Sequence, residues 1–129
     1  ISGDTIVLND GKKVRYAGIA SLPKGSSWEK VAQEANSYLV KDRAVSLVVE
    51  PDLSSEDTIV AFVYTPILID SQKKFLFVNA EMVRFGLLQA LPSMPGCQNK
   101  NLWNSLFELQ EKEAKPLRRG IWSEISDRK

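Results

Sequence analysis

The pattern of apolar and polar residues first predicts a β-hairpin near the start of the chain. The apolar run over residues 6–8 leads into Asn9-Asp10-Gly11, a tripeptide typical of tight hairpin turns. Residues 14–19 then alternate between two faces, so we expect them to return as the second strand. The segment Leu22-Pro23-Lys24-Gly25 ends this regular structure.

A helical pattern follows, and it begins with the sequence of a capping box. Ser26 and Glu29 have the Ser-x-x-Glu spacing in which each side chain bonds to the other residue's backbone amide. The face predicted to be buried comprises Trp28, Val31, Ala32, Ala35, Tyr38 and Leu39, and the face predicted to be exposed comprises Glu29, Lys30, Gln33 and Asn36.

The middle of the chain has the pattern of further strands. Residues 44–50 are rich in valine, which predicts a strand, and the polar residues 51–57 predict a turn. Residues 58–64 predict another strand. Pro66 is expected to interrupt it, which gives the following hairpin an irregular first arm.

Two more helices are predicted in the last third of the chain. Asn79 and Asn101 are expected to cap them, because an asparagine side chain can accept hydrogen bonds from the free amides of a first turn. Ala80, Val83 and Leu87 form the expected buried side of the first helix. The apolar stripe of the second helix contains Trp103, Leu106, Phe107 and Ala114, and Pro116 is expected to kink or end it.

This element order predicts an α+β domain in which a small curled antiparallel sheet is covered by helices. The 129 residues have the length of one domain, and we expect residues 1–129 to form it. The longest apolar run, residues 59–69, is interrupted by Thr65 and Pro66, so no membrane segment is expected. Ile1 begins abruptly in a strand-like stretch, which indicates an upstream segment.

The composition excludes several kinds of active site. The chain has no histidine, so it contains no Ser-His-Asp or Cys-His nucleophile system and no histidine-ligated zinc. One cysteine excludes a disulfide within the chain, and we expect Cys97, in a Pro-Gly loop, to be exposed. The net charge of +1 argues against strong nonspecific binding of nucleic acid. Hydrolysis would have to use carboxylates, arginine, lysine and an oxygen-bound metal.

Short motifs in a fixed order along nearly the whole chain resemble the staphylococcal-nuclease-like (thermonuclease) domains. The set comprises Gly3-Asp4-Thr5-Ile6-Val7-Leu8, Asn9-Asp10-Gly11, Arg15, Gly18-Ile19, Val78-Asn79, Val83-Arg84, Gly86-Leu87, Glu113-Ala114-Lys115 and Arg119-Gly120-Ile121-Trp122-Ser123. The resemblance implies a five-stranded OB-fold barrel with three helices, and a first strand that is truncated before Gly3. OB-fold barrels commonly bind oligonucleotides on one strand face.

In active members of that family, nucleic acid is cleaved with calcium. Two aspartates and a threonine carbonyl hold the ion, a glutamate acts near the attacking water, and two arginines bind the scissile phosphate. On this chain the resemblance implies Asp4 and the Ser21 carbonyl as metal ligands, and Arg15 as the first catalytic, substrate-binding arginine. Lys12 and Lys13 are candidate phosphate contacts, or else solvated residues of a hairpin turn.

The other catalytic positions depart from the family pattern. Ala20 replaces the second aspartate, Lys24 lies near the position expected for the glutamate, and Thr58 replaces the second arginine. Glu56 adds negative charge where phosphate would lie. Because loss of one electrostatic catalyst commonly costs about a hundredfold to a thousandfold in rate, we predict that nuclease activity has been lost.

We therefore expect a monomeric module, without a resident cofactor, that binds a protein or a single-stranded nucleic acid. The alternative is a weak or altered calcium-dependent phosphodiesterase in which Asp4 acts with Asp52, Glu56 or Asp57. Asp4 and Arg15 also have a purely structural interpretation, in which the carboxylate stabilises its own turn and pairs with the arginine. By the family resemblance, an extracytoplasmic or secreted location is expected.

Overall fold

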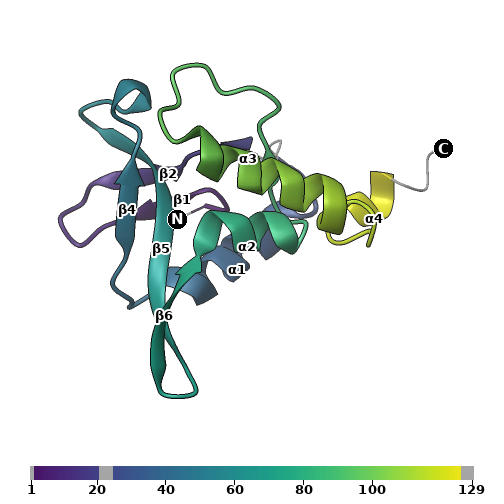
Figure 1. Cartoon of the computed structure of the whole chain (residues 1–129), viewed down its shortest axis with the longest axis horizontal. Coiled ribbons are helices and arrows are strands. Elements are labelled where there is room, and N and C mark those ends of the chain that lie inside the picture. The colour runs from purple at the N-terminus through teal and green to yellow at the C-terminus, as the bar shows by residue number, and fades with distance from the viewer. Residues whose placement is uncertain (1, 21–24, 126–129) are drawn as a thin grey trace.

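The computed structural model describes residues 2–20 and 25–125, and it confirms the α+β organisation (Figure 1). The strands are β1 (Thr5–Val7), β2 (Lys13–Tyr16), β3 (Ile19–Ala20), β4 (Ser46–Val49), β5 (Thr58–Ile69), β6 (Gln72–Phe77) and β7 (Gln89–Ala90). The helices are α1 (Glu29–Val40), α2 (Val78–Arg84), α3 (Lys100–Leu109) and α4 (Trp122–Ile125), with a 3-10 turn over Pro51–Leu53 and a π-helical turn over Gln110–Ala114.

The main sheet has five strands in the order β1-β2-β5-β4, and β6 pairs with β5 as well. The predicted first hairpin is confirmed, since Ile6 lies opposite Val14. Its return strand is shorter than predicted, because the chain turns at Ala17 and Gly18 before β3, which pairs with β7 in a separate small sheet. β2 and β5 are parallel, and the helices lie together on one side of the sheet (Figure 1).

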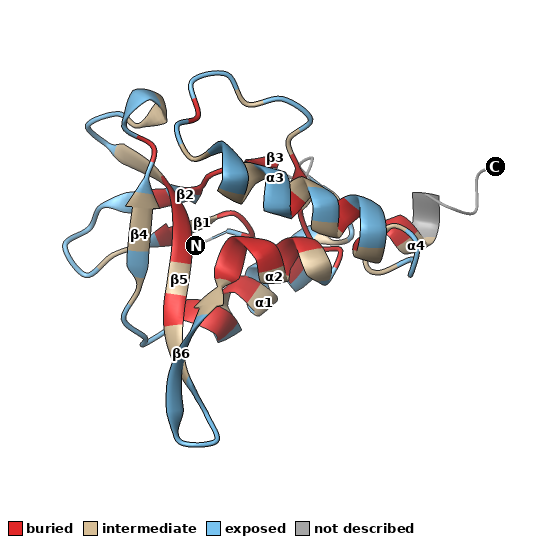
Figure 2. Ribbon diagram, in the orientation of Figure 1, coloured by how far each residue is buried: buried red, intermediate tan, exposed pale blue. Residues whose placement is uncertain are grey.

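The core lies between the sheet and the helices. Figure 2 shows buried segments along β5 and over most of α2. Fully buried side chains come from both layers: Val14, Tyr16, Phe62 and Val63 from the strands, and Met82, Val83 and Leu106 from the helices. The predicted burial of Val83, Leu87 and Leu106 is confirmed.

The capping box predicted at Ser26 is wrong. The helix begins at Glu29, and its N-cap residue, Trp28, makes no side-chain capping bond. The Ser26 hydroxyl instead accepts a hydrogen bond from the Trp28 amide over 3.2 Å. The Glu29 carboxylate accepts one from the Gly25 amide over 3.1 Å. Both side chains therefore bond to the turn that precedes the helix.

The predicted faces of α1 also need correction. Ala32 and Leu39 are buried as expected, but Val31 and Tyr38 are exposed. Asn36, expected on the polar face, is fully buried. A buried amide is stable there because it has polar partners on the first strands, which are described below.

Pro66 does not interrupt the strand. β5 continues through it, and Pro66 lies opposite Phe75 of β6. On the other side of β5, pairing with β4 ends at Tyr64. Pro66 therefore lies where β5 has one strand neighbour, so that its missing N–H costs no hydrogen bond to β4.

Neither predicted asparagine cap is correct. Asn79 is the second residue of α2; its side-chain oxygen accepts from the Val63 amide over 2.8 Å, and its nitrogen donates to the Ala17 carbonyl over 2.9 Å. It thus ties α2 to β5 and to the turn after β2. Asn101 lies inside α3, whose N-cap residue is Asn99. Pro116 follows the π-helical turn that ends this helix, as predicted.

Candidate functional site

The structure brings Asp4 and Arg15 together at one end of the first hairpin. Thr5 lies opposite Arg15 in the β1–β2 register, which places the preceding residue, Asp4, beside the arginine. The Arg15 Nε atom is 4.0 Å from Asp4 Oδ2, with 48% of the arginine side chain and 13% of the aspartate side chain exposed. The expected metal ligand and the expected phosphate-binding arginine are therefore an ion pair.

The other oxygen of Asp4 is also engaged within its own turn. Asp4 Oδ1 accepts a hydrogen bond from the Ser2 hydroxyl over 2.9 Å and from the Thr5 hydroxyl over 3.1 Å. Both oxygens thus have local partners. These contacts agree with the structural interpretation of the sequence, in which Asp4 stabilises its own turn and pairs with Arg15.

Tyr16 and Asn36 hold this turn from the inside. The Tyr16 amide donates to the Asp4 carbonyl over 2.8 Å. The Asn36 amide donates to the Ser2 carbonyl over 2.8 Å and accepts a hydrogen bond from the Tyr16 hydroxyl. Burial raises the pKa of Tyr16, an effect that the bond to Asn36 partly offsets and the charge of Asp4 reinforces. The phenol therefore stays protonated and can donate.

Our sequence reasoning missed both supporting residues, although a signal for Asn36 was present. Asn36 is four residues from Ala32 and from Val40, so it shares their helix face, and both are buried. A lone amide on an apolar face indicates a buried polar contact.

The described residues do not fit a calcium site of the family type. Calcium binds six to eight oxygens, commonly including several carboxylates. In residues 2–20 and 25–125, no three Asp, Glu, His or Cys side chains gather closely enough to hold a metal. Ala20, which the sequence resemblance aligns with the second aspartate, has only a methyl side chain. Ser21 and Lys24, predicted near this site, lie outside the described residues.

Two of the other candidate carboxylates, Glu56 and Asp57, lie away from Asp4. Val7, the last residue of β1, lies opposite Lys13 of β2, and Lys13 lies opposite Thr58 of β5. These three residues therefore form a row across the sheet at the end of β1 that is farther from Asp4. Glu56 and Asp57 directly precede Thr58, whereas Asp4 precedes the opposite end of the strand. Asp52 is in the 3-10 turn, where it accepts a hydrogen bond from the Gln98 side chain over 3.4 Å.

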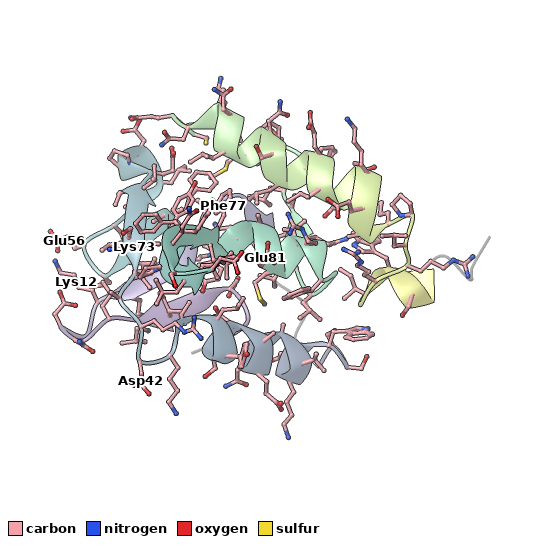
Figure 3. The ribbon with its side chains drawn as sticks, turned by 60° about the horizontal axis from the view of Figure 1, so that its bottom comes forward. Lys12, Asp42, Glu56, Lys73, Phe77 and Glu81 are labelled. Carbon is pink, nitrogen blue, oxygen red and sulfur yellow. The ribbon has the colours of Figure 1, made fainter. Side chains whose placement is uncertain are left out.

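The two predicted lysine contacts have different positions. Lys13 is two residues from Arg15 on the exposed face of β2, so both cations point the same way. Lys12 lies in the hairpin turn, where its amide donates to Asp10 over 3.0 Å. Figure 3 shows Lys12 and Glu56 at the same end of the molecule, which agrees with the β2–β5 register.

A small apolar cavity lies next to Arg15. Its volume is about 250 Å³, and it lies between the end of β2, β5 and the loop after β7. Arg15 contributes a positive charge and Ser93 a hydroxyl to the wall. The apolar lining includes Tyr16, Leu53, Val60, Leu91, Met94 and Pro95. This arrangement suits a ligand that joins an anionic group to a flat apolar one.

Trp28, Trp103 and Cys97 do not line this cavity. Trp28 and Trp103 both pack partly against the core, as predicted, and Trp103 Nε1 donates to the Leu91 carbonyl over 2.8 Å. The predicted exposure of Cys97 is wrong, because this thiol is buried. Burial raises the pKa of Cys97, and the nearby Glu50 carboxylate raises it further.

Comparison with known proteins agrees with the family resemblance of the sequence. The sequence profile described as staphylococcal nuclease homologue matches residues 13–124. A search of curated proteins found no match. Each helix in the described part of the chain is too short or too polar to cross a membrane. The family match, over most of the sequence and on an α+β fold of the OB type, shows that the chain belongs to the staphylococcal nuclease homologues.

Proposed function

We propose that this chain is a noncatalytic nucleic-acid-binding module, which holds a single-stranded segment against β2 and β5 without cleaving it. The observation behind this proposal is the state of Asp4, both of whose carboxylate oxygens have partners within the hairpin and its turn. The position that would supply a second acidic ligand is Ala20. A single engaged carboxylate holds calcium poorly, because the ion needs several oxygens.

Binding is supported by groups that do not require a metal. The half-exposed guanidinium of Arg15 can donate two parallel hydrogen bonds to a phosphate. Lys13 adds a second cation on the same face of β2. The apolar cavity beside Arg15 offers space for an unstacked base.

The alternative phosphodiesterase would require carboxylates to converge on Asp4. Glu56 and Asp57 lie beyond the far end of β1, and the Asp52 carboxylate already accepts a hydrogen bond from Gln98. These positions argue against the alternative. The cavity beside Arg15 could instead bind a protein, and the experiment must distinguish that case from binding of nucleic acid.

Fluorescence anisotropy of a labelled single-stranded oligonucleotide, in EDTA and over a range of salt concentrations, tests the proposal. With contacts from Lys13 and Arg15, the logarithm of the binding constant should fall with the logarithm of salt concentration at a slope of about −1.4. Arg15→Ala should weaken binding and reduce the slope to about −0.7.

Arg43→Ala is the matched control, because it removes the same charge from an exposed residue that lines a different cavity. It should leave the slope unchanged. Equal effects of the two variants, or no binding at low salt, would overturn the proposal and leave the cavity to a protein ligand.

A further inference from the structure

The β5–β6 hairpin extends beyond the body of the protein as an exposed arm. We define the arm as residues 66–75, which lie past the last pairing of β5 with β4. It projects from the rest of the molecule in Figure 1 and is exposed along most of its length in Figure 2. Apolar side chains are nevertheless prominent on it, since Leu68 is 77% exposed and Phe75 is 56% exposed.

The apolar side chains of the arm form a stripe along one face. Leu68 lies opposite Lys73, and Pro66 lies opposite Phe75, so these four residues share a face. The Lys73 ammonium lies 5.8 Å from the centre of the Phe75 ring. At the base of the arm the same face continues into Phe77, which stacks on Tyr64. Lys74 lies on the opposite face, beside Ile67.

A groove with acidic residues begins where this stripe ends. It is a cavity of about 530 Å³ between β6, α2 and the end of α3. Phe75, Phe77 and Leu109 supply apolar lining, Glu81, Glu108 and Glu113 supply carboxylates, and Arg84 and Lys112 are the cations of the lining. We call it the glutamate groove. Figure 3 shows Lys73, Phe77 and Glu81 following one another across the view.

We propose that the arm of one copy of this chain packs into the glutamate groove of a second copy, in a dimer with two-fold symmetry. The arm offers an apolar stripe with a lysine, and the groove offers apolar residues with three glutamates against two cations. The two surfaces are thus complementary in charge as well as in polarity. Glu81 pairs with Arg84 at 3.0 Å and Glu113 with Arg119 at 3.8 Å, which makes Glu108 the natural partner for the incoming Lys73.

The position of Phe75 makes this symmetry possible. Phe75 belongs to both the arm and the groove. Figure 3 places Lys73 of the arm and Glu81 of the groove on either side of Phe77. A two-fold axis beside Phe75 therefore places each arm along the groove of the other copy. The lengths agree: the arm runs about 13 Å from Phe75 to Ser71, and the groove runs about 10 Å from Ser105 to Lys112.

Packing through this face is favoured over extension of the sheet by its edges. Lys73 and Lys74 of one β6 would lie beside those of another and repel, and Pro66 lacks an amide hydrogen on β5. Lysine and proline are the residues that commonly protect strand edges from pairing. None of the residues named for the glutamate groove lines the cavity beside Arg15, so both proposals can hold together.

Sedimentation velocity of the full chain at several concentrations tests the proposal. The wild-type protein should form a dimer whose fraction rises with concentration up to about millimolar. Lys73→Glu should raise the dissociation constant at least about tenfold, because it places like charges together in both halves of the interface. Lys74→Glu makes the same charge change on the opposite face and should leave the constant unchanged.

A mixture of two variants provides the sharpest result. Glu108→Lys should also be monomeric by itself, as should Lys73→Glu. Mixed in equal amounts they should form a heterodimer, because both contacts then join opposite charges. A wild-type protein that remains a monomer, as expected from the sequence, would overturn the proposal and leave this face to another protein. Equal effects of Lys73→Glu and Lys74→Glu, or a mixture that stays monomeric, would overturn it too.

Discussion

The buried carboxylate of Glu50 accepts a hydrogen bond from the backbone amide of Asn99, with 3.1 Å between Oε2 and N. The Asn99 side chain donates to the same oxygen, and the Gln98 amide donates to the other one. Asn99 is the N-cap residue of α3, where backbone amides lack partners within the helix. Glu50, which directly follows β4, therefore fixes the start of α3 against the sheet.

Replacing Glu50 by glutamine should destabilise the fold. Glu50→Gln weakens three charge-assisted hydrogen bonds, so the free energy of unfolding should fall by about 2–3 kcal/mol. Urea unfolding at pH 7 measures this change. Glu56→Gln makes the same substitution at an exposed position and should cost less than about 0.5 kcal/mol. Equal losses in the two variants would contradict the assigned role.

The same carboxylate should make stability depend on pH in the acidic range. Burial by itself raises the pKa of Glu50, but the hydrogen bonds from Gln98 and Asn99 outweigh it and lower the pKa overall. Its stabilising effect is therefore complete above the ordinary glutamate pKa of about 4.3 and is lost as pH falls through the lower pKa of the folded state. The stability difference between wild type and Glu50→Gln should shrink on acidification. A constant difference from neutral to strongly acidic pH would count against this linkage.

Asn36 should be more important for stability than a polar helix residue usually is. Asn36→Leu leaves the Tyr16 hydroxyl and the Ser2 carbonyl without their amide partner, which should cost about 2–4 kcal/mol. Asn104→Leu, at an exposed position of α3, is the control and should change stability little. Thermal unfolding of the two variants measures the contrast, and similar midpoints would show that the Asn36 bonds contribute nothing.

The contact between Gly86 and the chain before Gly120 should exclude any side chain. A Cβ atom on Gly86 would lie 2.1 Å from the Arg119 carbonyl oxygen, and the Ile121 amide donates to the Gly86 carbonyl over 2.8 Å. Gly86→Ala should therefore cost more than about 3 kcal/mol in unfolding free energy. Gly25 has a similarly positive φ of 82° but open space around it. Gly25→Ala should therefore lower the unfolding free energy by a smaller amount, which reflects only the strain of alanine at a positive φ.

Cys97 should react slowly with thiol reagents in the folded protein. Its thiol is buried, and its raised pKa keeps the thiolate population small at neutral pH. Labelling with a chromogenic disulfide at pH 8 should be much slower in buffer than in urea. It should accelerate in Glu50→Gln, because that change removes a nearby negative charge and loosens the loop. Equal labelling rates in buffer and in urea would contradict the burial.

The sequence pattern predicted elements whose cause is local. Asn9-Asp10-Gly11 specified the first turn, and the turn set the register that pairs Thr5 with Arg15. The proximity of Asp4 and Arg15 followed from that register. Helical periodicity likewise predicted the helix order and the burial of Leu106.

Contacts between distant segments decided the features that the sequence did not predict. Asn79 has the sequence position of a helix cap, but its side chain forms buried hydrogen bonds with the Val63 amide and the Ala17 carbonyl instead. Cys97 lies in a Pro-Gly loop that looks exposed, yet Glu50 holds the residues after it against β4. The cavity beside Arg15 needs Leu53 from one loop and Met94 from another, a juxtaposition that no local pattern encodes.

The most direct test of the account is a cleavage assay on end-labelled single-stranded DNA and RNA in the presence of calcium. We predict no more product than in the protein-free control, for the wild-type chain and for Asp4→Ala alike. Calcium-dependent cleavage that is lost in Asp4→Ala and retained in Glu56→Gln would contradict the account, because it would show that the ion pair with Arg15 opens to form a working metal site.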